Sequence, residues 1–568
     1  MIGVISKVEQ KAAVEEFFEL FKTPWEYYVL GRSYDVLVTT LGEVPQVKAG
    51  LVVVYGAERP EADESIGIGT QGKHSGGYLI HQGFAVPIYG DLATFELEGE
   101  FEACVRTKSG IAGLRGVLST GTSVVRVGYD LFEEVRLLLS TGQPVEHAQT
   151  PSLDIHIAML RDWILGEGIP LLEIPPSPLG HSFVVCLTHD IDFVGIRNHR
   201  FDHTMWGFLY RSTVGAVRSF LRRRISVKRL LETWRAVLYL PFIHLGWAKD
   251  FWDPFEWYSQ VEEKLPTTYF FIPFKGRKGE NVPGKNASRR AAAYELADVK
   301  AWATILEKAG CELGVHGIDA WHNVEKGKAE LKRISEITSA PSNGIRMHWL
   351  LRNSKTAAIL EEAGYVYDSS AGYNETIGYR NGSTQVFRPL GVTRLLELPL
   401  HVQDGALFYA DRLDLSDREA EEPCEGLIGI ARRFGGVLTV LWHDRSHGPE
   451  RFWGDFYKRL VGVLKSTDAW FATAAQAVAW FQQRREVLFE RLGTGGLRIC
   501  ACGKQEVTLP QLSIRVYGPS VRKDAKSPLD APFVPMEIAW NERTVIEFNS
   551  DLQRISETPS GLSAFGTH

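Results

Sequence analysis

Short apolar runs alternate with stretches of helical spacing from about residue 182 to 483, and this alternation limits the possible folds more than any other feature of the sequence. The runs have strand length and fall at 183–187, 267–272, 311–315, 344–347, 365–367, 395–398, 437–441 and 470–472. Helical stretches lie between most of them, for example at 298–307, 354–363 and 456–464. Strands that alternate with helices form a parallel sheet. Seven or eight such units predict a barrel, in which chemistry occurs at the carboxyl ends of the strands.

The chain on either side of this segment does not show the same regular alternation of strand-like and helical stretches, so we expect three parts. Residues 1–180 are an expected N-terminal α/β domain that ends in a proline-rich linker at 173–180. Residues 181–483 are the expected barrel, and residues 484–568 an expected small β-rich region. Helices are expected at 130–140 and 153–165, where apolar residues recur at helical spacing.

Composition excludes several classes of protein. A chain of 568 residues with 44% hydrophobic residues and a net charge of −6 is typical of a soluble globular protein and gives no reason to expect nucleic acid as a partner. No segment approaches the roughly 20 apolar residues of a membrane-spanning helix. The charged N-terminus lacks the apolar region of a signal peptide, and six cysteines are too few for a disulfide framework. We therefore expect a protein of the reducing cytoplasm.

Several of the apolar runs end in polar residues, which are unusual in a strand that is buried in a core. They are Asp190 and Asp192 after the first run, His316 and His322 after the third, Arg346 and His348 at the fourth, Asp368 at the fifth and His443 at the seventh. Any one of them alone is more typical of a structural residue or a helix cap. Strand ends at one rim of a barrel converge, however, and carboxylate with imidazole is a ligand set suited to Zn²⁺. A site with three protein ligands leaves a position for water, which then reacts near neutral pH, so the coincidence predicts a metal hydrolase.

Several of these segments resemble the motifs of the polysaccharide deacetylases (carbohydrate esterase family 4, the nodulation-factor deacetylase homology domain). Residues 187–192 (LTHDID) resemble the first motif, 312–316 (ELGVH) the histidine motif and 440–443 (VLWH) the late leucine/histidine motif. Residues 267–272 and 470–473 resemble the second and the closing strand. The resemblance covers about residues 182–483. It implies a distorted (β/α)7 barrel that hydrolyses an acetamido or acetyl ester group on a glycan or glycan precursor, with Zn²⁺ or another divalent metal such as Co²⁺ as cofactor.

The resemblance also implies roles for individual residues. Asp190 matches the general base and Asp192 and His316 match metal ligands, while His443 matches the general acid, with Arg346 orienting the base and Asp368 supporting the acid. The sequence departs from the pattern in two places, because Ile191 separates the two aspartates and His316 and His322 are six residues apart. Six residues turn about 240° on a helix, so His322 is a ligand only if the segment between the two histidines is a loop. His348 is the alternative third ligand.

Two alternatives remain open at this point. The altered spacing is also compatible with a catalytically silent barrel that binds glycan or scaffolds a polysaccharide-assembly complex, and with a barrel that acts on a small C–N substrate. Residues 211–235, which follow the first strand, hold eight Lys/Arg against one acidic residue, with apolar residues between them. This segment predicts either a solvated helix with a core-facing stripe or a basic flap that contacts an anionic glycan or a membrane surface.

Overall fold

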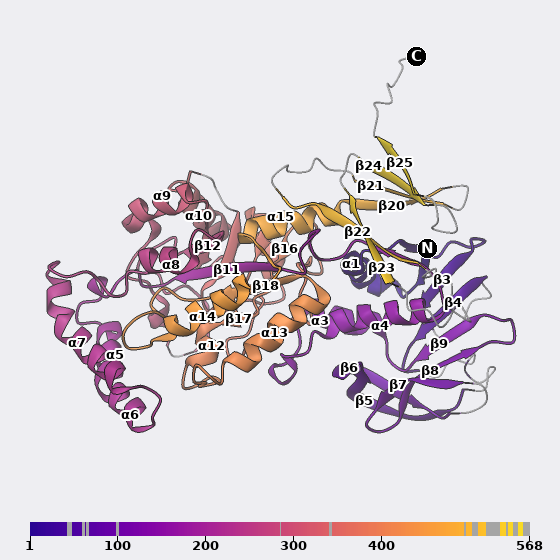
Figure 1. The fold of residues 1–568 in the computed structure, drawn as a ribbon, viewed down its shortest axis with the longest axis horizontal. Helices are drawn as coiled ribbons and strands as arrows, with labels where there is room; N and C mark the ends of the chain where they lie inside the picture. Colours follow the sequence, from indigo (N-terminus) through magenta and orange to yellow (C-terminus); the bar gives the residue numbers. More distant parts are fainter. Residues whose placement is uncertain are drawn as a thin grey trace, which may run out of the picture. The chain divides into compact units, whose positions relative to one another are not determined.

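A computed structural model of the protein describes residues 1–41, 48–58, 63, 68–97, 101–284, 286–339, 343–492, 496–501, 509–518, 534–540, 544–548 and 555–559 (Figure 1). The chain divides into two compact units. Unit 1 comprises Met1–Gly180, Asn381–Ser383 and Ala479–His568, and unit 2 comprises His181–Arg380 and Thr384–Val478. The three-part division expected from the sequence stays a prediction.

Unit 2 is built on a parallel sheet. Within the described residues nine strands take part, in the order β16-β15-β14-β13-β12-β11-β18-β17, with β19 beside β11. The strands are β11 (Val184–Ile191), β12 (Thr267–Phe271), β13 (Glu312–Gly317), β14 (Gly344–Met347), β15 (Tyr367–Asp368), β16 (Leu396–Glu397), β17 (Val402–Gln403), β18 (Val437–Leu441) and β19 (Trp470–Phe471). The pairings between them are parallel. The expected α/β class with a parallel sheet is confirmed, and the count of seven barrel units stays a prediction.

Helices follow most of these strands, as the alternation predicted. They are α5 (His203–Tyr210), α6 (Ala216–Leu221), α7 (Val227–His244), α8 (Phe255–Glu262), α9 (Lys300–Lys308), α10 (Val324–Ser335), α11 (Thr356–Ala363), α12 (Asp404–Phe408), α13 (Glu421–Phe434) and α14 (Trp453–Lys465), and α15 (Ala474–Arg485) follows β19. Local sequence sets their starts: the Asn323 side chain accepts a hydrogen bond from the Lys326 amide at the start of α10, and Ser226 does the same for Arg229 at α7.

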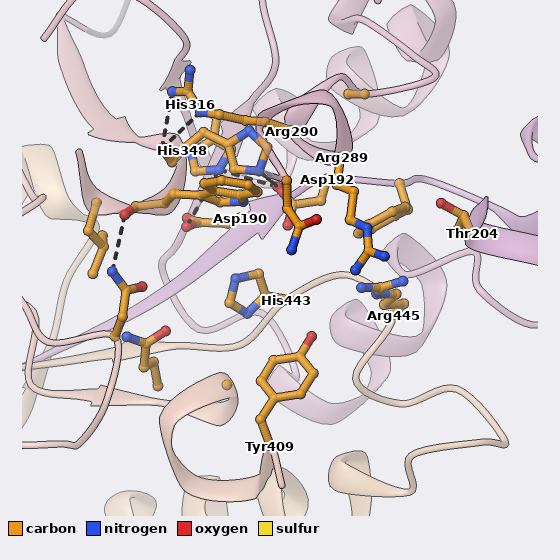
Figure 2. A pocket seen from close by; sticks show the side chains of 18 of the residues that line it. Asp190, Asp192, Thr204, Arg289, Arg290, His316, His348, Tyr409, His443 and Arg445 are labelled. Carbon is orange, nitrogen blue, oxygen red and sulfur yellow. Dashed lines mark hydrogen bonds and ion pairs between the residues drawn. The ribbon is translucent and has the colours of Figure 1, made fainter. Parts of the chain in front are cut away.

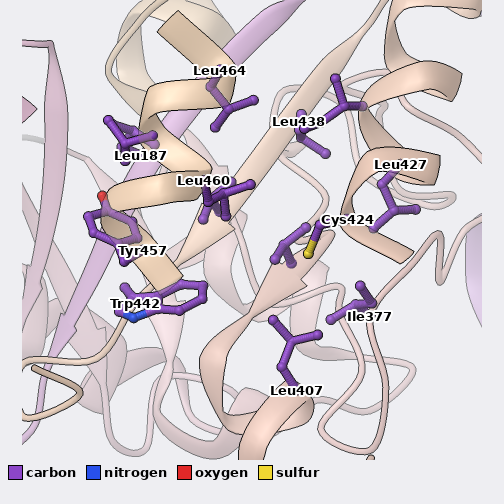
Figure 3. Close-up of a cluster of buried hydrophobic side chains, with 14 of the residues drawn as sticks. Leu187, Ile377, Leu407, Cys424, Leu427, Leu438, Trp442, Tyr457, Leu460 and Leu464 are labelled. Atoms are coloured by element: carbon purple, nitrogen blue, oxygen red, sulfur yellow. The ribbon is translucent and has the colours of Figure 1, made fainter. Parts of the chain in front are cut away.

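One hydrophobic core joins β11 and β18 to α13 and α14 (Figure 3). Leu427 of α13 and Leu460 and Leu464 of α14 pack toward the strands, because apolar residues recur every three or four positions on each helix. A second core lies around β12, β13 and α9 to α11, and it includes Ile191 from the end of β11. The two cores hold β11 from both sides, which fixes the position of the strand that carries the aspartates.

Unit 1 contains a mixed sheet of order β2-β1-β3-β4-β9-β8-β6-β5-β7. Its strands are β1 (Ile2–Ile5), β2 (Trp25–Tyr27), β3 (Tyr34–Thr39), β4 (Ala49–Tyr55), β5 (Thr70–His81), β6 (Phe84–Phe95), β7 (Glu102–Thr107), β8 (Ile111–Val117) and β9 (Ser123–Val127), and its helices are α1 (Lys11–Phe21), α3 (Leu131–Ser140) and α4 (Ser152–Gly166). Helices α3 and α4 lie where helical spacing predicted them.

Two smaller antiparallel sheets complete unit 1. One consists of β10 (Leu171–Glu173), β22 (Leu512–Gly518) and β23 (Val534–Trp540), and the other of β20 (Val487–Arg491), β21 (Leu497–Ala501), β24 (Thr544–Phe548) and β25 (Ile555–Pro559). None of the helices in the described ranges of the whole chain combines the length and the apolar character that crossing a bilayer requires.

The core of unit 2 yields a stability prediction at two adjacent residues of α14. Leu464 is fully buried in the core cluster, whereas Val463 is 42% exposed. We expect Leu464→Ala to lower the free energy of unfolding by about 2–5 kcal/mol, because it leaves a cavity among close-packed side chains. Val463→Ala should change it by less than about 0.5 kcal/mol. Denaturant titration followed by tryptophan fluorescence measures both, and equal losses for the two variants would contradict the packing described here.

Candidate active site

The period of a β-strand sorts the residues at the end of β11 onto two faces. Asp190 and Asp192 are two residues apart and line one cavity, while Ile191 between them is fully buried in the second core. His189 is also fully buried, and its Nε2 lies 2.6 Å from Glu262 Oε1. The inserted isoleucine therefore leaves both carboxylates on the same side of the strand.

Asp192 meets two histidines from neighbouring strands. One ligand atom from each of Asp192, His316 and His348 lies within 4.8 Å of the others. Asp192 Oδ1 is 3.3 Å from His316 Nε2 and 3.6 Å from His348 Nε2. His316 belongs to β13, and His348 begins the short turn that follows β14 (Figure 2). The cluster is thus built at the carboxyl ends of β11, β13 and β14, of which β13 and β14 are neighbours and β11 is separated from β13 by β12.

The donor set fits a divalent cation. Asp192 Oδ1 is buried and accepts no hydrogen bond from the described part of the chain, which leaves an oxygen in need of a partner. His316 Nδ1 lies 3.0 Å from the Arg346 carbonyl oxygen, so Nδ1 carries the proton and the Nε2 lone pair faces Asp192. One carboxylate oxygen and two imidazole nitrogens form a ligand set that zinc and similar metals take in hydrolases.

Of the two candidate third ligands, the structure brings His348 to the cluster. His322 lies on the loop after β13, and its Nε2 is 3.4 Å from Asp319 Oδ1. The glycine and isoleucine that follow His316 carry the chain away in a loop, and a glutamate of α10, Glu330, accepts hydrogen bonds from two amides of that loop, those of Ile318 and Asp319. His322 therefore forms a pair of its own with Asp319.

Burial and charge set the protonation of the cluster. Burial raises the pKa of the Asp192 carboxyl, but the imidazoles of His348 and His316 outweigh this effect and hold it well below its usual range. Burial, reinforced by the neighbouring His316 and Arg290, lowers the pKa of His348 well below its usual value although Asp192 opposes this. The cluster is thus an ionised carboxylate facing a neutral imidazole, as metal binding requires.

Asp190 is held by Arg346, as its assignment as a base requires. Arg346 Nη1 donates to Asp190 Oδ1 at 3.1 Å and to the Thr188 hydroxyl at 2.7 Å. Its Nε donates to the Ser369 carbonyl oxygen at 3.0 Å, and the guanidinium lies over the Phe270 ring. The other oxygen of Asp190, Oδ2, is 3.8 Å from His316 Nε2 and so lies beside the metal cluster.

His443 follows β18 and faces the cluster across the cavity (Figure 2). The carboxylate that holds it is Asp404, at the start of α12: His443 Nδ1 is 2.6 Å from Asp404 Oδ1, and the His443 amide donates to Asp404 Oδ2 at 2.8 Å. Burial lowers the pKa of His443, but the charge and hydrogen bond of Asp404 outweigh it and raise the value to about 10. His443 is therefore protonated at neutral pH.

Asp368, the sequence candidate for the support of His443, lies elsewhere. It accepts a hydrogen bond from the Ser370 hydroxyl, and burial raises its pKa beside the equally buried Glu397. The side chain of Ser370 also accepts from the Met347 amide, which ties Asp368 to the segment before His348. The carboxylate partner of His443 is Asp404, and Asp368 belongs to a neighbouring buried network.

One cavity of about 860 Å³ is lined by Asp190, Asp192, His316, His348 and His443. Its walls also contain residues that the sequence did not single out, namely Arg290, Tyr409, Arg445 and Arg451. Arg290 donates to the carbonyl oxygens of Gly317 and His348 at 3.2 and 3.1 Å, so it holds the two loops that carry the histidines. The cavity thus combines a cation-binding cluster, a held carboxylate and a protonated imidazole.

No family model and no curated protein matches the chain. Among solved structures, the chain is similar to a protein of Mycobacterium smegmatis described as a polysaccharide deacetylase, at 18% identity and a TM-score of 0.33, over 55% of this chain and 95% of that one. It is also similar to Puue allantoinase (14% identity, TM-score 0.31, over 54% and 92%). A third is the Xyl-CE4 domain of a multidomain xylanase from the hindgut metagenome of Trinervitermes trinervoides (12% identity, TM-score 0.23, over 52% and 89%). Of these three structures, the one from Mycobacterium smegmatis carries the name of the polysaccharide deacetylases.

Proposed function

We propose that unit 2 is a metal-dependent deacetylase that hydrolyses an acetamido or acetyl ester group on a glycan or glycan precursor. The observation that carries the proposal is the convergence of three groups in one cavity: the Asp192–His316–His348 cluster, Asp190 beside it and His443 opposite. The coarser class is a hydrolase of C–N or ester bonds, and the acetyl group and the glycan are the finer part of the proposal.

Asp192, His316 and His348 would hold Zn²⁺ or another divalent ion such as Co²⁺. When bound, the ion supplies Lewis-acid chemistry, which acidifies water and polarises the acyl oxygen. The buried Arg290 keeps the backbone of both histidine loops in place, so the ligand geometry does not depend on the ion alone.

Asp190 acts as the general base. Its Oδ1 is occupied by Arg346, which leaves Oδ2 to take the proton of the attacking water. The water oxygen forms the new bond to the acyl carbon, and the C–N or C–O bond to the sugar then breaks with its electron pair leaving on the sugar side. Arg346 pairs with the charge of Asp190 and fixes its orientation, because a buried carboxylate needs a charged partner.

His443 acts as the general acid. A leaving amine or alkoxide needs a proton as the bond breaks, and an imidazolium held by Asp404 supplies it from the opposite wall. The Ser446 hydroxyl also donates to Asp404. With both oxygens engaged, the carboxylate keeps the His443 ring in one orientation.

The alternative of a silent barrel was suggested by the altered motif spacing. That spacing is no obstacle to the proposed chemistry, because Asp190 and Asp192 line the same cavity. A small C–N substrate would use the same residues, so a panel of substrates separates this alternative from the glycan.

The identity of the third metal ligand can be tested by substituting each candidate histidine. We expect His348→Gln to weaken the binding of Zn²⁺ at least tenfold, because one of three ligands is lost. His322→Gln removes the neighbouring histidine from the same region and should leave Zn²⁺ affinity unchanged. Competition titration with a chromogenic chelator measures both variants, and the reverse order of effects would exclude His348 as a ligand.

The role of Asp190 as the general base can also be tested by substitution. Asp190→Asn should lower acetate release at least about 100-fold, since general-base catalysis contributes about that much or more, while Zn²⁺ content stays as in the wild type. The assay uses N-acetylated sugar oligomers, O-acetylated sugars and non-sugar acetamides. Glu375→Gln is the matched control, because it removes another carboxylate from the cavity wall away from the cluster. Full activity in Asp190→Asn would refute the assignment, and activity on the non-sugar amides alone would replace the glycan by a small C–N substrate.

A further inference from the structure

Helix α7 has two apolar faces, and only one of them is buried. Ala236, Leu240 and Ile243 belong to the core that joins α7 to α5. Val227, Leu231, Trp234, Leu238, Phe242 and Leu245 recur every three or four residues on another face, and all six are exposed. A soluble helix normally presents polar residues on its outer face, so this second stripe needs a covering surface.

The preceding helices repeat the pattern. Along α5, the π-helical turn η4 (Arg211–Gly215) and α6, the exposed residues Trp206, Tyr210, Val214, Val217 and Leu221 also follow a spacing of three or four. Helices α6 and α7 lie next to each other, and Figure 1 places α5 to α7 at one edge of unit 2. We call the two stripes together the α5–α7 face. Eleven apolar side chains exposed on adjacent helices are more than the single, scattered apolar residues of an ordinary surface, and such a gathering marks an interaction surface.

Basic residues border the α5–α7 face. Arg218 and Arg222 are exposed, and neither has an ion-pair partner among the described residues. Arg224 and Arg229, in contrast, pair with Asp414 and Asp455 of the same unit. Trp and Tyr beside apolar residues, with unpaired arginines at the edge, is the composition of helices that lie in the interface of an anionic bilayer.

We propose that the α5–α7 face rests on the surface of a membrane that contains anionic phospholipids. The same helix that exposes Trp206 and Tyr210 contributes His203 and Thr204 to the cavity wall, and Arg211 continues that wall. A protein seated in this way holds the cavity beside the lipid surface. The proposal concerns binding alone and does not depend on the proposed catalytic function.

Flotation with vesicles of phosphatidylcholine, with and without phosphatidylglycerol, tests the α5–α7 face with the full chain. We expect the protein to float with the vesicles that contain phosphatidylglycerol and to be released by high salt, which screens the arginines. The triple variant Leu221→Ser, Leu238→Ser and Trp247→Ser should abolish flotation, since each of these side chains is more than 70% exposed on or beside the face. Arg218→Glu with Arg222→Glu should weaken binding at least about tenfold.

The matched control changes three exposed apolar residues elsewhere in unit 2, Ile305→Ser, Val366→Ser and Val463→Ser, and should float as the wild type does. A wild-type protein that stays in the soluble fraction with both kinds of vesicle overturns the proposal. So does equal flotation of the α5–α7 triple variant and the wild type. A doubled mass in light scattering that returns to one chain in the triple variant would assign the face to a second copy of the chain.

A separate cluster of cations lies inside the cavity, on the side of His443. Arg211, Arg445 and Arg451 all line the cavity, and burial together with repulsion from Arg451 and Arg445 lowers the pKa of Arg211 to about 10. Arg211 has two buried nitrogens, Nε and Nη2, that make no hydrogen bond within the described residues. Arg445 stacks 3.7 Å from the centre of the Phe193 ring, and Arg451 Nη2 donates to the Tyr409 hydroxyl. Among the residues that the structure describes, only Glu450 lies within ion-pair distance of the three side chains, at 3.8 Å from Arg451 Nε.

We infer that this arginine cluster binds an oxyanion of the substrate, a phosphate or a carboxylate. The inference rests on the proposed function, since it assigns an anionic group to the molecule that His443 would protonate. Buried guanidinium donors without partners are satisfied best by such an oxyanion, which accepts charge-assisted hydrogen bonds from several of them at once.

Calorimetric titration with inorganic phosphate and with glucuronate tests the arginine cluster in the purified full chain, before and after removal of metal by a chelator. We expect binding to persist without metal and to weaken at least about tenfold in Arg211→Gln and in Arg445→Gln. Arg412→Gln, which removes an arginine of the cavity wall that is already paired with Glu375, is the control. Binding lost on chelation, or lost equally in Arg412→Gln, overturns the inference, and preference for phosphate or glucuronate names the anion. Unchanged Zn²⁺ affinity in the arginine variants separates this result from a failure of the proposed function.

Discussion

The buried guanidinium of Arg346 is the contact on which the candidate site depends. A charge that is removed from water is tolerated only when its donors all find partners, and Arg346 donates to Thr188, Asp190 and Ser369. It thereby links β14 to β11 and to the residue that follows β15. Its own carbonyl oxygen accepts the proton of His316 Nδ1. One residue of β14 thus orients the candidate base through its side chain and a metal ligand through its backbone.

Three carboxylates stand around the cavity, Asp190, Asp192 and Asp404, and the way in which their charges are paired explains why a cation fits beside Asp192 and not beside the other two. Asp190 is balanced by Arg346, and Asp404 is balanced by His443, each through a direct contact. Asp192 faces two imidazoles, of which burial keeps His348 neutral. Its negative charge is therefore the one that these pairings leave without a permanent counter-charge, and a divalent ion would supply it.

The sequence identified the polar residues that end the strands with long apolar runs. It missed Asp404, which follows a strand of two residues. The runs before Asp190, His316 and His443 are clear strands of four or more residues, so their polar ends stood out. Asp404 follows β17, which has only two residues, and nothing in its length marks it as a strand. A search for a buried acidic residue after any apolar stretch, here 395–402, would have found it.

Side-chain direction explains the rest of the difference between sequence and structure. Asp368 was correctly expected at the end of a strand, but which network a strand-end side chain enters depends on the neighbouring loop, and Ser370 draws Asp368 toward Glu397. For the third ligand, spacing excluded a helix and left a loop possible. The loop exists, but its amides bond to Glu330 and its histidine turns to Asp319. Such choices depend on contacts between distant segments, which periodicity does not encode.

The segment between β11 and α8 shows how one insertion serves two surfaces. Apolar residues on both sides of α7 are compatible with either side as the core, and only packing against α5 decides that Leu240 and Ile243 are inside. The face that is left outside carries a hydrophobic cost in water at every exposed side chain. An insertion that needed only to wall the cavity would be more stable with polar residues there. The retained apolar stripe therefore argues for a surface that the helices meet, next to the wall that Arg211 contributes.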